Sequence, residues 1–202
     1  GWMLADDAGA HRGADAVILA VPAPRLADLV ADIAPRAAAA AARIPVASAV
    51  VLAMAVPGGT PFPPQSGVLV ASGERLHAKA ITLSTRKWGA RGNAELLRMS
   101  FGRFGDDVAR RTSDENLHAF AIADLQTVFG IAVDPIDILV HRWIDAMPQY
   151  TPGHGELAVD LRTGLPPTMA IAGNYIDGVG VPACVAAAGR AAAAVVAATT
   201  RR

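Results

Sequence analysis

Residues 168–199 read TMAIAGNYIDGVGVPACVAAAGRAAAAVVAAT, and this stretch decides the fold class. A short apolar run at 168–172 predicts a strand, and a glycine-rich turn follows at 173–180. Residues 181–199 predict a long alanine-rich helix with Pro182 in its first turn, where proline is favourable. A strand, a turn and a helix in this order are typical of an α/β domain.

A second segment of this kind stands near the other end of the chain. Residues 15–21 (DAVILAV) are a continuous apolar run, which predicts a buried strand. Residues 24–33 carry apolar side chains at helical spacing and begin with proline, so they predict a helix. Both ends of the chain therefore indicate α/β structure.

The middle of the chain has a different pattern. Leu97, Met99 and Phe101 alternate with smaller or polar residues, which predicts a strand with one buried face. Residues 113–129 predict a single long helix. Further strands are expected at 47–56, 67–71, 78–84, 96–104 and 136–143. Because few helices separate these strands, we expect an antiparallel sheet flanked by the two α/β ends.

Composition excludes several classes of protein. The chain has 202 residues, of which 52% are hydrophobic and 18% charged, so it is a packed globular chain and not a disordered one. Its formal net charge is zero, which argues against a nucleic-acid-binding surface. Cys184 is the single cysteine, so no intrachain disulfide forms and a reducing, cytosolic setting is expected. No histidines are paired at metal-ligand spacing, so we expect no metal site.

The glycine-rich turn is the strongest local signal for a ligand. Gly178, Gly180 and Ala183 fit the spacing G-x-G-x-x-A of dinucleotide-binding turns. Pro182 lies inside the motif and the first glycine lies several residues after the strand, which both depart from that pattern. The free N–H groups at a helix start would still favour an electron-rich ring or a phosphate. The spacing fits equally well a helix entry that binds no ligand.

Three segments together resemble the flavin-dependent protoporphyrinogen and coproporphyrinogen oxidases, members of the flavin amine-oxidase-like superfamily. They are AGNYIDGVGVPACVAAAG at 172–189, MPQYTPGH at 147–154 and KAITLSTRKW at 79–88. The resemblance covers nearly the whole chain, but only the C-terminal part of the family.

The resemblance implies an α/β plus α+β fold, the C-terminal portion of a two-domain FAD oxidase. Residues 1–45 would be a piece of the FAD-binding domain, residues 46–150 the substrate-binding domain with its antiparallel sheet, and residues 151–202 a return to the FAD-binding domain. The N-terminal dinucleotide-binding unit of this Rossmann-like domain would be missing. We therefore expect a fragment of a longer enzyme that alone neither holds FAD tightly nor turns over.

The function implied by the resemblance is oxidation of a porphyrinogen to the porphyrin in haem biosynthesis. We rank coproporphyrinogen III first and protoporphyrinogen IX second as the substrate. FAD is the implied cofactor and molecular oxygen the implied acceptor. We expect a cytoplasmic protein without a nucleic-acid partner, and the resemblance leaves peripheral membrane contact and a homodimer open.

The resemblance also implies binding residues, although it assigns no side chain a catalytic role. The backbone of Val179, Gly180 and Val181 would lie against the flavin. Trp143 would pack near the cofactor, although a core aromatic residue is an equally good interpretation. Lys79 would pair with a substrate propionate, and its alternative is a solvated strand lysine.

Two alternative functions stay open. One is another flavin oxidase such as an amine oxidase, but the terminal motif offers Tyr175 and no matching aromatic cage to flank the flavin. The other is a non-catalytic remnant that binds a porphyrin. His154 is expected to order its loop through a hydrogen bond and not to act as a base.

Overall fold

The computed structural model describes residues 1–89 and 92–200 and divides the chain into two units. One unit comprises Gly1–Val46 with Met147–Arg202, and the other comprises Ala47–Ala146. Each unit has its own sheet and its own apolar core. The expected mixed α/β class with an antiparallel sheet is confirmed.

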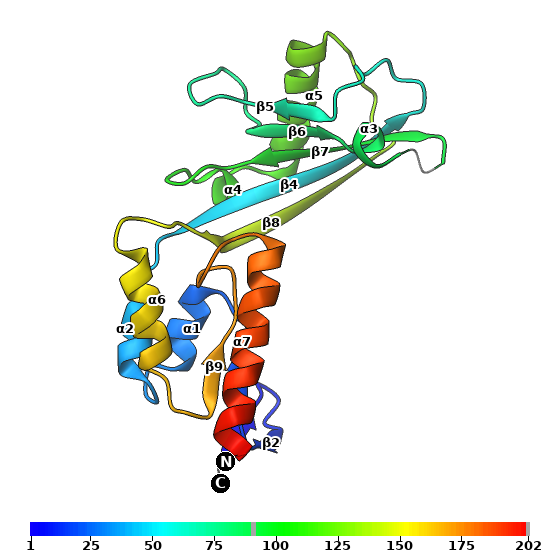
Figure 1. The fold of residues 1–202 in the computed structure, drawn as a ribbon. Helices are drawn as coiled ribbons and strands as arrows, with labels where there is room; N and C mark the ends of the chain where they lie inside the picture. The colour runs from blue at the N-terminus through cyan, green and yellow to red at the C-terminus, as the bar shows by residue number, and fades with distance from the viewer. Residues whose placement is uncertain (90–91, 201–202) are drawn as a thin grey trace. The chain divides into compact units, whose positions relative to one another are not determined.

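The unit of residues 47–146 is built on a five-stranded sheet in the order β5-β6-β7-β4-β8 (Figure 1). Its strands are β4 (Val46–Pro57), β5 (Gly67–Leu69), β6 (Ala80–Leu83), β7 (Ala94–Phe101) and β8 (Asp137–Pro148). The pairs β5–β6, β6–β7 and β4–β7 are antiparallel. Leu97, Met99 and Phe101 are buried and Arg98 is exposed, as the alternation predicts.

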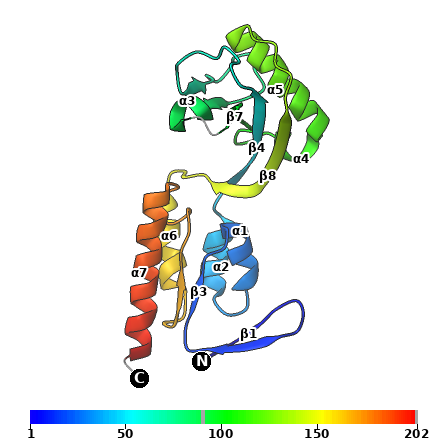
Figure 2. The ribbon, with the colours of Figure 1, turned by 90° about the vertical axis from the view of Figure 1, so that its right-hand side faces the viewer.

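Helix α5 (Asp114–Phe129) covers one face of this sheet (Figures 1 and 2). It begins after Ser113, whose side chain accepts a hydrogen bond from the Asn116 N–H, and ends at Gly130 in the left-handed conformation. Leu117, Ala121 and Leu125 are fully buried against the sheet. The predicted helix 113–129 is therefore confirmed. Two short helices, α3 (Ser84–Trp88) and α4 (Val108–Arg111), were not predicted.

The other unit contains a parallel pair of short strands, β3 (Val17–Leu19) and β9 (Met169–Ile171). Helix α7 (Val181–Thr200) packs on one face of this pair through Ala191 and Val195 (Figure 2). A second core on the other face includes Leu26 and Tyr175. The helices of that core are α1 (Ala23–Leu29), α2 (Pro35–Ala42) and α6 (His154–Thr163). The strand–turn–helix order predicted for both chain ends is thus present.

Several boundaries differ from the prediction. The helix expected at 24–33 ends at Leu29, and α2 begins separately at Pro35. Ala34, the residue before this proline, has non-helical backbone, so the two helices are not continuous. The strand expected at 136–143 continues to Pro148, so the segment predicted as a loop at 147–154 begins in a strand and ends in α6. An antiparallel hairpin of β1 (Trp2–Ala5) and β2 (His11–Ala14) was not predicted.

Among the described residues, α7 is long and apolar enough to cross a membrane, judged by length and composition alone. In this structure α7 packs on β9 through Ala191 and Val195, and it carries Arg190, which forms an ion pair with Asp177.

Candidate functional site

The three consecutive residues expected at the flavin lie where the glycine-rich turn enters α7. The Gly180 carbonyl accepts a hydrogen bond from the Cys184 N–H at 3.0 Å, which makes Gly180 the residue that caps the helix. Val179 is 51% exposed and Val181 is 76% exposed. A Cβ atom added at Gly180 would meet only the Pro182 Cδ, at 3.8 Å. The helix start therefore presents an open, apolar surface.

This surface fits a flavin. A flat ring could approach the Gly180 backbone closely, because no side chain stands there. The exposed side chains of Val179 and Val181 would give it apolar contact. The first N–H groups of a helix carry partial positive charge, so they favour negative charge on a reduced ring. Val179, Gly180 and Val181 are therefore candidate residues for holding a flavin.

The segment that precedes the helix is held from a different part of the chain. The Tyr150 hydroxyl donates to the Asn174 carbonyl at 2.8 Å, and His154 Nε2 lies 3.0 Å from the Tyr175 carbonyl oxygen. The Tyr150 and His154 rings stack at a centroid distance of 3.8 Å. MPQYTPGH and AGNYIDGVG, two separate motifs in the sequence, therefore form one contact region.

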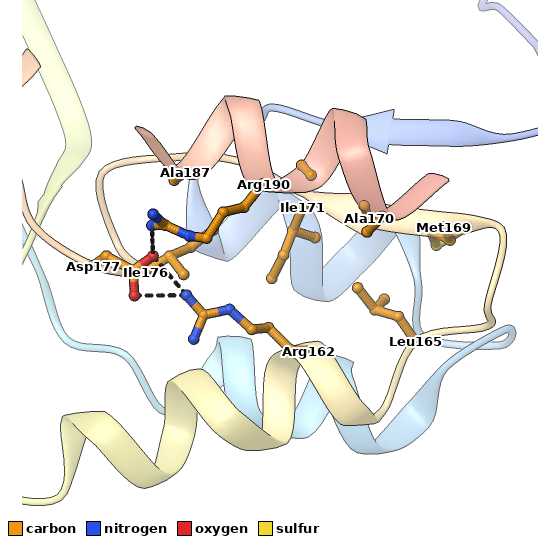
Figure 3. Close-up of a pocket in the computed structure, with 11 residues that line it drawn as sticks. Arg162, Leu165, Met169, Ala170, Ile171, Ile176, Asp177, Ala187 and Arg190 are labelled. Carbon is orange, nitrogen blue, oxygen red and sulfur yellow. Dashed lines mark hydrogen bonds and ion pairs between the residues drawn. The ribbon is translucent and has the colours of Figure 1, made fainter. Parts of the chain in front are cut away.

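Asp177 is a further anchor of this segment. Arg162 of α6 donates to both Asp177 carboxylate oxygens at 2.6 Å, and Arg190 of α7 donates to one of them (Figure 3). These partners, Arg162 first, hold the pKa of the Asp177 carboxyl below its usual value, although partial burial opposes them. The turn is therefore attached to the helices on both sides of it.

A cavity of about 460 Å³ lies beside this ion-pair group, between α6 and α7 (Figure 3). Its walls are mostly apolar and include Leu165, Met169 and Ile171. Arg162 and Arg190, which also line it, point their guanidinium groups toward Asp177. Ile176 and Asp177 of the turn also line this cavity, whereas Val179 and Val181 do not, so it is distinct from the exposed surface at those two residues.

The other two expected binding residues belong to the unit of residues 47–146. Trp143 lies on β8, is half exposed and makes an edge contact with the His141 ring at 4.5 Å. Lys79 Nζ donates to the Gly102 carbonyl at 2.6 Å. Burial lowers the pKa of Lys79, Arg103 lowers it further, and Asp106 raises it. Since an ammonium has three donors, Lys79 retains N–H groups for a carboxylate.

Sequence reasoning missed Arg162, Asp177 and Arg190 as a group. No local pattern joins them, because they come from α6, the turn and α7. Tyr150 and His154 belong to the MPQYTPGH motif, and the hydrogen bond through which His154 was expected to order its loop is present, with the Tyr175 carbonyl as its partner. Within residues 1–89 and 92–200, no three His, Cys, Asp or Glu side chains are grouped as a metal site.

Comparisons with known proteins show which family the chain belongs to. The model of the flavin-containing amine oxidoreductase family matches residues 4–196. The coproporphyrinogen III oxidase of Mycobacterium bovis is 64% identical over 196 residues, which are 97% of this chain and 43% of that protein. The coproporphyrinogen III oxidase of Mycobacterium leprae is 61% identical over 191 residues, which are 95% of this chain and 42% of that protein.

A solved structure is also similar to this chain. The "Putative protoporphyrinogen oxidase" of Exiguobacterium sp. 255-15 superposes with a TM-score of 0.83 at 26% identity. The match covers 99% of this chain and 44% of that one. The chain thus spans less than half the length of these relatives. The family model covers nearly all of its residues, and the chain belongs to the flavin-containing amine oxidoreductase family.

Proposed function

We propose that the protein oxidises a porphyrinogen to the porphyrin in haem biosynthesis. Coproporphyrinogen III is the first candidate substrate and protoporphyrinogen IX the second. The mycobacterial relatives named coproporphyrinogen III oxidase, at 64% and 61% identity, support this order. The observation that carries the proposal is the open start of α7 at Val179–Val181, backed by contacts from the MPQYTPGH segment.

FAD is the proposed form of the flavin. When bound, it would accept hydride equivalents from the porphyrinogen, and O2 would serve as the final acceptor. The chain's own residues would position and stabilise it. Val179 and Val181 would contact the ring, and the N-terminus of α7 would stabilise negative charge that develops on it. This assigns the direct electrostatic contact of the chain with the ring to the backbone at the start of α7.

Substrate contacts are proposed for the unit of residues 47–146. Lys79 would pair with a propionate through the N–H groups that it does not donate to Gly102. Trp143 would supply an apolar surface, since half of its side chain is exposed. Four propionates on coproporphyrinogen III, against two on protoporphyrinogen IX, favour the former at a basic site.

We also propose a cytoplasmic protein. Co-sedimentation with anionic vesicles tests peripheral membrane contact, and gel filtration of the purified protein tests a homodimer. A protein that sediments with vesicles is peripheral, and one that elutes at twice its mass is a dimer.

The function is tested with the full-length gene product. Its visible spectrum is recorded, each porphyrinogen is added in air, and porphyrin fluorescence is followed. A flavin spectrum with faster fluorescence growth from coproporphyrinogen III is the expected result. A flavin spectrum without growth would indicate another flavin oxidase. A colourless protein that does not take up FAD would favour a porphyrin-binding remnant.

A further inference from the structure

His154 is a buried polar residue that the proposed chemistry does not use. Its side chain is 7% exposed, and its ring stacks on Tyr150. Because a carbonyl oxygen only accepts hydrogen bonds, the contact at 3.0 Å means that Nε2 carries the proton and donates to the Tyr175 oxygen. Nδ1 is buried and has no hydrogen-bond partner among the described residues. Within the part of the chain that the structure describes, the hydrogen bond of the imidazole to the backbone is therefore its bond to the turn.

The bond from His154 is one of a set that fixes the inner side of the turn. Tyr150 holds the Asn174 carbonyl, and His154 holds the next carbonyl along the chain. Burial raises the pKa of Tyr150, and a backbone hydrogen bond from Gly178 acts in the opposite direction. Tyr150 therefore contacts the turn at two places.

The outer side of the turn is free by contrast. Val179 and Val181 are exposed, and the space beside Gly180 is open. Since residues 174–177 are held from inside, the backbone at 178–180 has a defined position from which it can meet a flat ring. Loss of one inner bond would let the turn adopt other conformations, so part of the binding free energy would be lost as ordering entropy.

We propose that His154 is a positioning residue of the flavin site, which acts through the Tyr175 carbonyl to preorganise the turn ahead of α7. The inference rests on the proposed function only in that the turn must contact a flavin. It does not depend on which substrate is oxidised. It predicts that the order of the turn depends mainly on the hydrogen-bond donor at Nε2 and less on the stacking of the His154 ring.

Two substitutions at His154 separate these contributions. His154→Phe keeps a ring that can stack on Tyr150 and removes the donor. His154→Gln loses the ring, and its amide N–H can reach the position of Nε2. His11→Phe is the matched control, because His11 is an exposed residue of β2 in the same unit. Tyr150→Phe is a second variant, which keeps the ring and removes the hydroxyl, and with it the bond to the Asn174 carbonyl and the contact with Gly178.

The first measurement is amide hydrogen exchange in the full-length protein without flavin. In His154→Phe we expect exchange at 174–180 to accelerate about five- to tenfold, the size expected for one net hydrogen bond. His154→Gln should restore most of the protection, and His11→Phe should match the wild type. Tyr150→Phe should accelerate exchange in the same segment, so a poorly folded His154→Phe would still leave a decisive variant.

The second measurement is the flavin itself. We expect FAD to bind about five- to tenfold more weakly to His154→Phe and its midpoint potential to become more negative, because the helix start no longer faces the ring in a fixed position. Wild-type affinity and potential in His154→Phe would overturn the proposal, as would equal losses in His154→Phe and His154→Gln. If the wild-type protein binds FAD but oxidises neither porphyrinogen, the proposed substrates are wrong. The measurements of amide exchange, FAD affinity and midpoint potential would still test the role of His154.

Discussion

Gly178 and Gly180 stand two residues apart, and the structure predicts a loss of stability for serine at Gly178 and a loss of flavin affinity for serine at Gly180. Gly178 has φ = +147°, a conformation that residues with side chains rarely adopt. A Cβ atom there would also lie 3.0 Å from the Ala183 Cβ, closer than the 3.5–4.0 Å or so that is optimal for two carbon atoms. Gly180 has neither constraint.

The expected magnitudes follow from these differences. Gly178→Ser should lower the free energy of unfolding by about 1–3 kcal/mol, the range for a residue forced into a glycine-only conformation. A gain of about 0.4–1 kcal/mol from the stiffer unfolded chain offsets part of this loss. Gly180→Ser should leave stability within about 0.5 kcal/mol, because serine is a favourable residue at the start of a helix.

Flavin affinity should distinguish the second variant. Gly180→Ser places two new atoms on the surface that the ring would approach, and overpacking of this kind costs about 1–3 kcal/mol. We therefore expect FAD to bind at least about fivefold more weakly, although the protein stays folded. Urea unfolding of the flavin-free full-length protein gives the stabilities, and fluorescence titration with FAD gives the affinities.

Two outcomes would refute this reasoning. If Gly178→Ser unfolds at the wild-type urea concentration, the positive φ at this turn carries no strain. If Gly180→Ser binds FAD with wild-type affinity, the ring does not approach the helix start, and the site assigned to Val179–Val181 is wrong. Loss of stability in Gly180→Ser as large as in Gly178→Ser would mean that the turn is packed on both sides.

Three other predictions follow from named contacts. Asp177→Asn removes the ion pairs with Arg162 and Arg190, so it should lower the free energy of unfolding by about 1 kcal/mol at pH 7. The pKa of Asp177 is lowered in the folded state. This stabilisation is therefore present above the unfolded pKa of about 3.9 and is lost as pH falls through the folded pKa. The free energies of unfolding of the wild type and Asp177→Asn, measured during acid titration, should therefore converge. Asp124 is buried and accepts from the His77 and Ala78 N–H groups, so Asp124→Ala should cost about 2–4 kcal/mol, and an unchanged urea midpoint would contradict this. Lys79→Met should raise KM for coproporphyrinogen III by about three- to tenfold, and KM for protoporphyrinogen IX by less. If the variant and the wild type have equal KM values for coproporphyrinogen III in steady-state assays, Lys79 does not contact a propionate.

Local elements could be predicted from the sequence where one segment carries its own signal. Helix α5 has a serine at its start, a glycine at its end and apolar residues on one face, and all three act within 18 residues. Strand β7 shows the alternation of a half-buried strand. These signals depend on side chains near one another along the chain, so they can be interpreted without knowledge of the rest of the fold.

Contacts between distant segments could not be predicted in this way. Strands β3 and β9 pair directly although about 150 residues separate them, and periodicity contains no information on which strand is the neighbour. The hairpin of β1 and β2 was missed because HRGA is exposed and polar and lacks the usual strand pattern. The same limit applies to the site, where the turn was found from its glycines and the contact with Tyr150 and His154 was not.

The charge of Asp177 links these contacts to the electrostatics of the site. A carboxylate that stands three residues before the helix cap would offset the partial positive charge at the start of α7. Arg162 and Arg190 both bind this carboxylate, so the group as a whole is cationic and leaves the helix end positive. Arg190 lies on α7 itself and Arg162 on α6, so the same ion pairs also connect the turn to both helices. Position and charge at Val179–Val181 therefore depend on these ion pairs as well as on the hydrogen bonds from Tyr150 and His154.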